Sequence, residues 1–425
     1  MQTTQDKRTA FHGINSDGWR IIAARALRTF GYGFTSVLLG VTLNAAGFST
    51  IQIGLLLTVA LVGDMVAIIL VALFADRVGR RRVLVFFALL MSISGLAFAF
   101  SHNLMILLLA AFFGTISPSS SENAPFFALE QAILPQTCSE ERRTDTFARY
   151  NLVAQLAGAL GGLSVVLPDL LHQSMNMSTA VAVRAMFAGY SLLALSTAVL
   201  FLSISEKVEM KSPDASGSVE GMSKQEMGRQ RMPLRKSRGI VLRLASFFAL
   251  DAFAGGLVVQ TILALWFHQR FGASLSVLGL LFFTANLLAA LSLPVAAWLS
   301  RRIGLLNTMV FTHLPSNMLL MLVPLMPIFP LAALVFLCRQ LLSQMDVPTR
   351  QAYTMSLVDP VERTAAASFT TVARSIGLSL SPVLAGVLLT GPALMLGLPF
   401  LCAGSLKSIY DLSLYRVFRR VKMPL

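Results

Sequence analysis

The chain has 425 residues, of which 55% are hydrophobic and only 13% are charged, and its formal net charge is +14. A typical soluble domain has about 25% charged residues, so this composition excludes an ordinary soluble protein. The three cysteines form neither a disulfide framework nor a metal-ligand pattern, and we expect no metal and no cofactor.

Apolar runs long enough to cross a bilayer recur along the whole chain, because a spanning helix needs about 20 such residues. Residues 1–18 are polar and carry no signal-peptide pattern, so we expect the first apolar run to remain as a span. The sequence predicts an all-α integral membrane protein with twelve transmembrane helices. They cover residues 19–44, 51–75, 82–101, 104–134, 145–169, 182–205, 239–267, 274–299, 305–326, 331–357, 364–389 and 392–414.

Two segments interrupt the series of apolar runs. The fourth run is interrupted by the serine-rich segment 117–125, which predicts one broken or kinked helix, tolerated where protein or a cavity covers the freed backbone. The polar segment 206–238 has no apolar periodicity and is predicted to be a flexible cytoplasmic linker. We therefore expect an N-terminal segment at 1–18, six-helix bundles at 19–205 and 239–414, and a cytoplasmic tail at 415–425.

Lys and Arg are concentrated in the loops that the twelve spans place on one side of the membrane. The opposite loops carry only Arg184 and Arg270. Basic loops stay on the cytoplasmic side, so both termini and the central loop are predicted to be cytoplasmic. We expect the chain to lie in a plasma membrane, namely a bacterial inner membrane. The membrane topology then explains the surplus of positive charge, and we expect no nucleic-acid partner.

The two predicted bundles also repeat one another at a spacing of 225 positions. The matched positions are Gly47 and Gly272, Ser49 and Ser274, Gly54 and Gly279, Arg77 and Arg302, and Gly79 and Gly304. Two parallel six-helix repeats with a solute site between them, near the membrane midplane, form a transporter architecture. A channel or a receptor could also carry a duplication.

The loop between the second and third spans reads Ala72-x-x-x-Asp76-Arg77-x-Gly79-Arg80-Arg81. It resembles the signature loop of the major facilitator superfamily, Gly-x-x-x-Asp-Arg-x-Gly-Arg-Arg, with Ala72 in place of the first glycine. The second copy, Arg301-Arg302-x-Gly304, lacks the acid. Segments 122–131 and 344–353 also resemble an uncharacterised bacterial branch of this family. The resemblance covers the whole chain and implies two pseudo-symmetric six-helix bundles that transport by alternating access.

The same resemblance implies a gating role for the loop motif and its second copy. The residues concerned are Asp76, Arg77, Gly79, Arg302 and Gly304. Glycine at position 79 permits a tight turn, and a carboxylate at a helix end interacts with nearby cations and with the helix dipole. The three arginines at 80–82 could instead serve only as orientation signals.

Charges inside the predicted spans are candidate functional groups, because a charge at the bilayer centre costs about 2.5–3.5 kcal/mol and usually faces a cavity or a partner. Asp251 is the first candidate for proton coupling, followed by Glu122 in the broken part of span four and by Asp64. The alternative for Asp251 is a structural ion pair with Arg28 or Arg374.

Arginines in the spans are candidate substrate contacts, because a guanidinium matches the geometry of a carboxylate or phosphate. We predict Arg28, Arg339 and Arg374 in this role, together with Gln260 and Asn286. Each arginine could instead neutralise an acid.

Five further polar positions in the spans also have structural interpretations. His313 could relay protons or be a packed polar side chain. Asp346 with Arg350, and Lys407 with Asp411, are four residues apart and can pair on a helix face, although Lys407 could instead snorkel to the interface.

The sequence contains no nucleotide-binding P-loop and no nucleophile constellation, so we expect neither an ATP-driven pump nor an enzyme. The leading hypothesis is a monomeric, proton-coupled carrier that exports a small organic solute, with the lipid bilayer, protons and that solute as its partners. The alternatives are an importer or exchanger of organic anions, a lipid flippase, and a non-transporting membrane sensor on a carrier fold.

Overall fold

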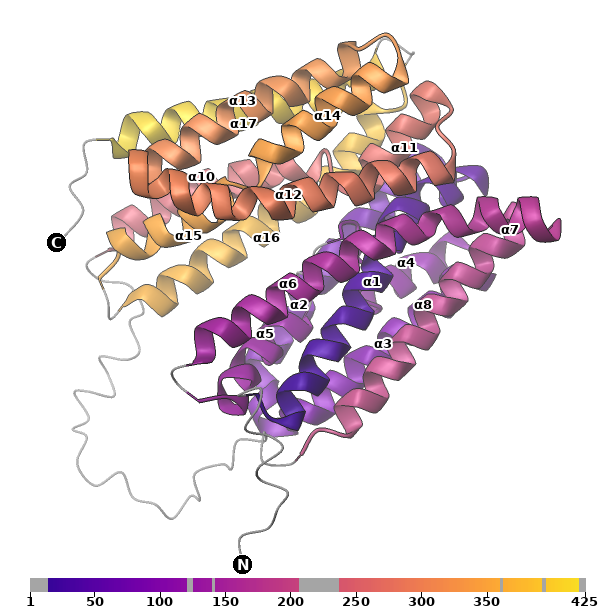
Figure 1. Cartoon of the computed structure of the whole chain (residues 1–425), viewed down its shortest axis with the longest axis horizontal. Helices are drawn as coiled ribbons and strands as arrows, with labels where there is room; N and C mark the ends of the chain where they lie inside the picture. Colours follow the sequence, from indigo (N-terminus) through magenta and orange to yellow (C-terminus); the bar gives the residue numbers. More distant parts are fainter. Residues whose placement is uncertain are drawn as a thin grey trace, which may run out of the picture. The chain divides into compact units, whose positions relative to one another are not determined.

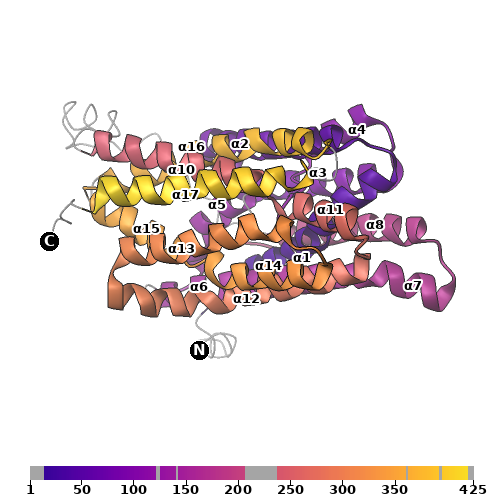
Figure 2. The ribbon, with the colours of Figure 1, turned by 90° about the horizontal axis from the view of Figure 1, so that it is seen from above.

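The computed structural model describes residues 14–120, 125–139, 142–205, 237–359, 362–391 and 395–419. These residues are almost entirely helical, apart from loops and an isolated bridge between Ile14 and Cys138. Each predicted span coincides with one helix or with two consecutive ones (Figures 1 and 2). The predicted linker lies outside the described residues over 206–236, as does Glu122.

The helices of the first half follow in chain order. They are α1 (Ser16–Ala45), α2 (Thr50–Val78), α3 (Arg80–Phe100), α4 (Leu104–Phe113), α5 (Pro125–Ile133), α6 (Arg143–Leu163), α7 (Leu167–Met175) and α8 (Thr179–Leu202). Side chains cap several of them, since Asn15 accepts from the Gly18 amide at α1 and Ser49 forms a capping box with Gln52 at α2.

The helices of the second half also follow in chain order. They are α10 (Arg238–Gly256), α11 (Gln260–Phe271), α12 (Leu275–Ile303), α13 (Leu305–Leu322), α14 (Phe329–Ser343), α15 (Asp346–Leu357), α16 (Arg363–Leu388) and α17 (Leu398–Phe418). Helix α16 continues through Pro382, and the amide of Val383 donates a hydrogen bond to the Thr58 hydroxyl. Such side-chain acceptors allow a proline inside a membrane helix.

Eight helical segments of the described chain are long and apolar enough to cross a membrane. The remaining predicted spans coincide with α1, with the broken pairs α4–α5 and α14–α15, and with α17, all of which carry charged residues or an interruption. Charged residues and breaks inside spans are features of membrane proteins that enclose polar sites.

The chain forms two compact units whose boundaries do not follow its midpoint. The first unit comprises Met1–Glu209, Val258–Leu287 and Pro382–Leu396, and the second comprises Met210–Leu257, Leu288–Ser381 and Gly397–Leu425. The division into bundles at 19–205 and 239–414 remains a prediction.

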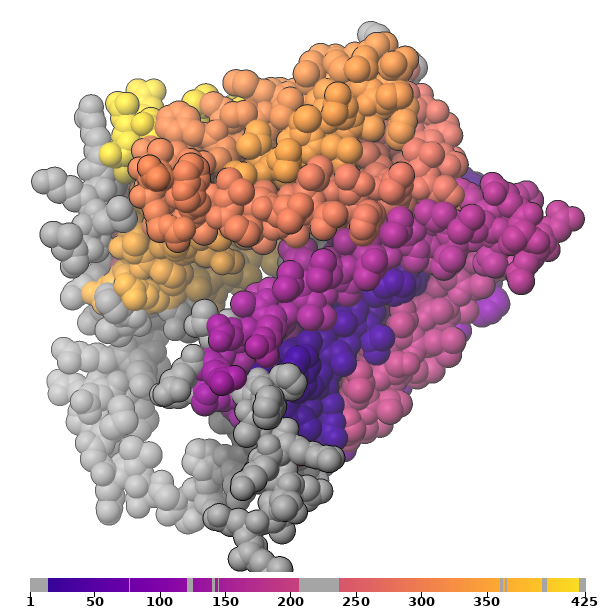
Figure 3. Space-filling view, in the orientation of Figure 1, coloured from indigo at the N-terminus to yellow at the C-terminus, as the bar shows by residue number. Residues whose placement is uncertain are grey.

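Within the first unit, α1 packs between α6 and α8 (Figure 3). Small residues permit this approach, because a Cβ atom added at Gly161 of α6 would collide with the backbone carbonyl of Phe30 on α1. In the second unit, α13 and α17 lie side by side (Figures 1 and 2). Their contact includes an apolar core in which Phe248, Tyr410 and Leu414 are buried.

The seventh predicted span, 239–267, lies within one candidate membrane span, Arg238–Phe271, but it is made of two helices with a break between them. Helix α10 ends at Gly256, and residues 257–259 are not helical. The amide of Thr261 donates to the Pro118 carbonyl at 3.2 Å, and its hydroxyl donates to the Ser36 carbonyl at 2.8 Å. Pro118 lies in the break between α4 and α5, so the two interrupted spans satisfy each other's free backbone groups.

The internal repeat is confirmed by the backbone. Among the described residues, four glycines have a positive φ, namely Gly47 (+92°), Gly79 (+103°), Gly272 (+66°) and Gly304 (+86°). They form two pairs, each separated by 225 positions, as the sequence repeat predicts. Glycine adopts such values at no steric cost, and the shared positive φ shows that both halves turn at corresponding positions.

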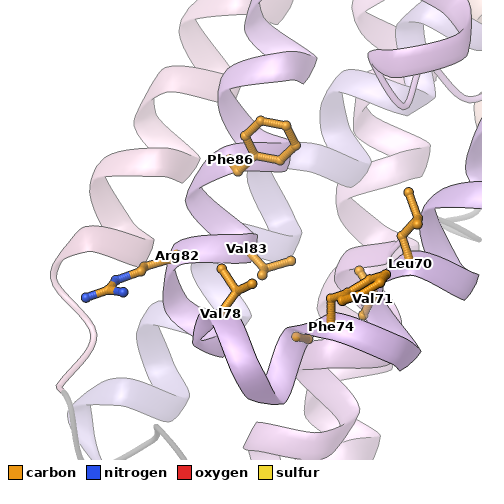
Figure 4. A pocket seen from close by; sticks show the side chains of 8 residues that line it. Leu70, Val71, Phe74, Val78, Arg82, Val83 and Phe86 are labelled. Atoms are coloured by element: carbon orange, nitrogen blue, oxygen red, sulfur yellow. The ribbon is translucent and has the colours of Figure 1, made fainter.

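A cavity of about 390 Å³ lies beside the turn between α2 and α3 (Figure 4). Its lining is apolar, with Leu70, Phe74 and Phe86 substantially exposed. The guanidinium of Arg82 points away from these side chains. Exposed apolar side chains of this kind suit contact with lipid chains, and the polar groups of the candidate sites lie elsewhere in the chain.

Candidate functional site

A dense group of charges surrounds Asp251 in the second unit. Asp251 lies on α10 and is buried. Its carboxylate accepts hydrogen bonds from Lys407 Nζ at 2.6 Å, from Arg350 Nη1 at 2.9 Å and from Arg374 Nη1 at 3.3 Å. These partners come from α17, α15 and α16, so one carboxylate connects four helices. A buried charge requires such partners, because an unpaired one is strongly destabilising.

The imidazole of His313, on α13, lies between two carboxylates. Its Nδ1 atom is 3.0 Å from both oxygens of Asp411, and its Nε2 atom is 4.0 Å from Asp251 Oδ1. Asn317, one turn further along α13, donates to Asp411 Oδ2 at 2.8 Å. All four side chains are buried. A group that can bind a proton on either nitrogen therefore has an acidic neighbour on each side.

We call this group the Asp251 cluster. Its basic members are Arg339, Arg350, Arg374 and Lys407, its acidic members are Asp251, Asp346 and Asp411, and His313 completes it. The predicted pair of Asp346 and Arg350 is confirmed, with 3.0 Å between Asp346 Oδ2 and Arg350 Nη1. With a neutral imidazole, the cations outnumber the carboxylates by four to three.

The predicted contact of Lys407 with Asp411 was wrong, and so was the alternative that Lys407 snorkels to the interface. Lys407 is buried and points to Asp251, while Asp411 contacts His313. The two side chains share a helix face, but packing against α10 and α13 gives each of them a partner on another helix.

The predicted substrate contacts Arg374 and Arg339 are both members of this cluster, with different surroundings. The Arg374 side chain is 36% exposed, compared with 9% for Arg350 and for Lys407. Arg339, on α14, donates to Gln340 at 3.3 Å and forms no ion pair with a described residue. Its Nε atom is buried and has no hydrogen-bond partner in the part of the chain that the structure describes.

Arg28 lies in the first unit and has a partner that the sequence analysis did not single out. Arg28 Nη2 donates to Glu130 Oε1 at 2.7 Å, and both side chains are 0% exposed. The Tyr150 hydroxyl donates to the other carboxylate oxygen of Glu130 at 2.8 Å. The Arg28 guanidinium also lies over the Phe126 ring, 4.3 Å from its centroid. A fully enclosed pair of this kind fits a structural role.

The remaining predicted substrate contacts, Gln260 and Asn286, meet in the first unit beside the broken spans. The Ser120 hydroxyl lies 3.2 Å from Gln260 Oε1 and 3.4 Å from Asn286 Oδ1. Gln260 donates to the Ser36 hydroxyl at 3.0 Å, and the buried amide nitrogen of Asn286 has no hydrogen-bond partner among the described residues. This is a second polar site, made of neutral groups.

The other predicted positions are located as follows. Asp64 is buried on α2, and Glu122 lies outside the described residues. Arg77 lies in the last turn of α2 and is exposed, as is Arg302 in the last turn of α12. Asp76 belongs to the last turn of α2, and the gating roles of all these residues remain predictions.

The protein has many membrane helices, its two halves repeat, and it encloses paired charges and interrupted helices. These are the features of a secondary transporter and not of an enzyme. The family model of the Major Facilitator Superfamily matches residues 21–382. The chain belongs to this superfamily.

Individual relatives agree with this assignment. An uncharacterized membrane protein of Saccharomyces cerevisiae is 26% identical, and the alignment covers 92% of each chain. A bacterial homolog of the human lysosomal transporter Spinster superposes with a TM-score of 0.73 at 14% identity, covering 98% of this chain and 99% of that one. A D-xylose–proton symporter superposes with a TM-score of 0.69 at 13% identity, covering 94% and 97%. The structural likenesses show a shared transporter fold.

Proposed function

We propose that this transporter couples the movement of a small organic solute to the movement of protons, and that His313 with its two carboxylate neighbours holds the coupling proton. The observation that carries the proposal is the position of the imidazole, with Nδ1 3.0 Å from Asp411 and Nε2 4.0 Å from Asp251. A structurally similar protein is named as a proton symporter, which is consistent with such coupling on this fold.

The chemistry of the proposed step follows from the three side chains. A neutral imidazole has one N–H donor and one acceptor, and a second proton turns both nitrogens into donors. The protonated ring then offers an N–H to each carboxylate. On the Asp251 side it competes with Lys407 and the two arginines for the same oxygens. Proton binding thereby weakens contacts that connect four helices, which is how a local charge can bias a conformational equilibrium.

The topology that we propose follows from the basic loops, which put both termini in the cytoplasm. We also propose, from the resemblance to a bacterial branch of the family, that the host membrane is a bacterial inner membrane, and that the protein acts as a monomer. Compact loops without an added external domain favour export of the solute. The alternative is the import or exchange of an organic anion. One observation favours it, because cations exceed carboxylates in the Asp251 cluster by four to three.

The test uses the full-length protein in liposomes that contain a pH-sensitive dye. Pools of metabolites, dyes and antibiotics are offered under an imposed proton gradient of either sign. We expect a solute-dependent proton flux, which His313→Gln reduces at least tenfold, while exchange of the same solute without a gradient continues. The matched control is His102→Gln, at an exposed histidine.

Two outcomes would contradict the proposal. Normal proton flux in His313→Gln would remove the imidazole from the coupling step. Solute movement that never carries protons would leave a carrier without proton coupling. If folded protein moved nothing from the whole panel, the sensor and flippase hypotheses would gain support instead.

A further inference from the structure

We propose that the transported solute carries an oxyanion, a carboxylate or a phosphate, and that Arg374 and Arg339 bind it. This inference rests on the proposed transport function and names its substrate class. It starts from the imbalance of the Asp251 cluster, where four basic side chains face three carboxylates. An anion between the helices would complete the charge compensation that a buried site requires.

Arg374 is the member of the cluster best placed to reach a solute. Its contact with Asp251 is the longest of the three, at 3.3 Å, and involves only Nη1. Its side chain is 36% exposed, while Lys407 and Arg350 are 9% exposed. A guanidinium has five N–H donors in a planar fork, so most of the donors of Arg374 remain for an oxyanion, which such a fork binds in bidentate fashion.

Arg339 supplies a second, independent observation. Among the described residues, its buried Nε atom has no hydrogen-bond partner, and its side-chain hydrogen bond to the neighbouring Gln340 is long, at 3.3 Å. It nevertheless lies within electrostatic range of Asp251 and Asp346. Buried donors are normally satisfied, so an unsatisfied guanidinium N–H beside an excess of positive charge points to an acceptor that arrives with the ligand.

The other predicted polar site carries no charged group. The group formed by Ser36, Ser120, Gln260 and Asn286 contains hydroxyl and amide groups only. It can bind the uncharged part of a solute, but it offers no charge to distinguish an anion from a neutral analogue. The charge selectivity of the carrier therefore resides in Arg374 and Arg339.

The experiment measures equilibrium binding to the full-length protein in lipid nanodiscs by titration calorimetry. The probes are three matched pairs of an anion and a neutral analogue: benzoate and benzamide, succinate and succinamide, and glucose 6-phosphate and glucose. We expect at least one anion to bind at least tenfold more tightly than its neutral analogue. Charge-assisted hydrogen bonds contribute about 1.5–3 kcal/mol, so Arg374→Gln weakens that anion about tenfold to hundredfold.

Three variants separate binding from folding. Arg374→Lys keeps the charge but loses the fork, and it recovers part of the affinity. Arg339→Gln weakens the same anion, while Arg363→Gln, at an exposed arginine on the same helix α16, leaves its binding unchanged. Thermal unfolding of each variant shows that the protein is folded.

The result that would overturn the inference is equal binding of a neutral analogue, unchanged anion binding in Arg374→Gln, or no binding of any anion. The proposed function fails differently. Anion binding without any proton flux would leave the oxyanion site and remove proton coupling, whereas proton-coupled transport of neutral or cationic solutes alone would do the reverse.

Discussion

Replacement of Asp251 by asparagine tests whether one carboxylate holds the second unit together. The three cations around it do not depend on it equally. Arg350 keeps Asp346 at 3.0 Å, and Arg374 is exposed enough for water to compensate it in part. Lys407 has Asp251 as its one ion-pair partner among the described residues, and it is buried. The cost of the substitution therefore comes mainly from Lys407.

The expected loss of stability in Asp251→Asn follows from these differences. Breaking a buried pair on one side costs about 3–5 kcal/mol, which we assign to Lys407. The loss of the exposed Arg374 contact adds about 0–1 kcal/mol. The double variant Asp251→Asn/Lys407→Gln removes both charges, so we expect it to recover most of the loss. Asp145→Asn, at an exposed aspartate on α6, provides the matched control.

The assay is thermal unfolding of the purified variants in one detergent. We expect the midpoints to rank wild type and Asp145→Asn highest, the double variant next and Asp251→Asn lowest. If the double variant were as unstable as the sum of the two single variants, Lys407 and Asp251 would not be coupled. If Asp251→Asn unfolded like wild type, the cations would have other compensation and the reasoning would be refuted.

Two further predictions concern the first unit and use the same assay. Glu130→Gln removes the negative charge from the buried 2.7 Å pair with Arg28 and should be the more destabilising of the two. Tyr150→Phe removes the 2.8 Å hydrogen bond from the Tyr150 hydroxyl to Glu130 and should cost about 1.5–3 kcal/mol; equal midpoints would contradict this order. Gly47→Ala should lower the free energy of unfolding by about 1–2 kcal/mol, because φ at Gly47 is +92°. The control is Gly189→Ala in α8, where the surrounding space is equally open, and it should raise the free energy of unfolding by about 0.4–1 kcal/mol. A stabilising Gly47→Ala would contradict the positive φ at this position.

The helices could be predicted from the sequence because hydrophobic runs and helix length are set by the bilayer. The break after Gly256 could not. Residues 257–259 are as apolar as their neighbours, so hydropathy does not change where the helix ends. The amide of Thr261, in the first turn after the break, is satisfied by a contact far along the chain, its hydrogen bond to the Pro118 carbonyl. Gly255 and Gly256, adjacent glycines inside a span, were the available signal.

The sequence predicted which residues carry charge into the membrane. It predicted less well which of these residues pair with one another. Spacing along one helix correctly predicted Asp346 with Arg350 and wrongly predicted Lys407 with Asp411. The difference arises from tertiary packing, because α10 and α13 bring other partners to the latter two. Glu130 was missed because it lies near the end of a predicted span, where an acid is ordinarily solvated.

The two proposals share one carboxylate, and this has a consequence for the direction of transport. A proton on His313 would weaken the contact of Asp251 with Arg374, and an oxyanion on Arg374 would take the same cation away from Asp251. Each event makes the other more favourable, as linkage requires. A carrier in which proton and anion promote each other's binding moves them together. If the oxyanion site exists, the cluster thus favours co-transport of an organic anion with protons over the export hypothesis, which needs the two to compete.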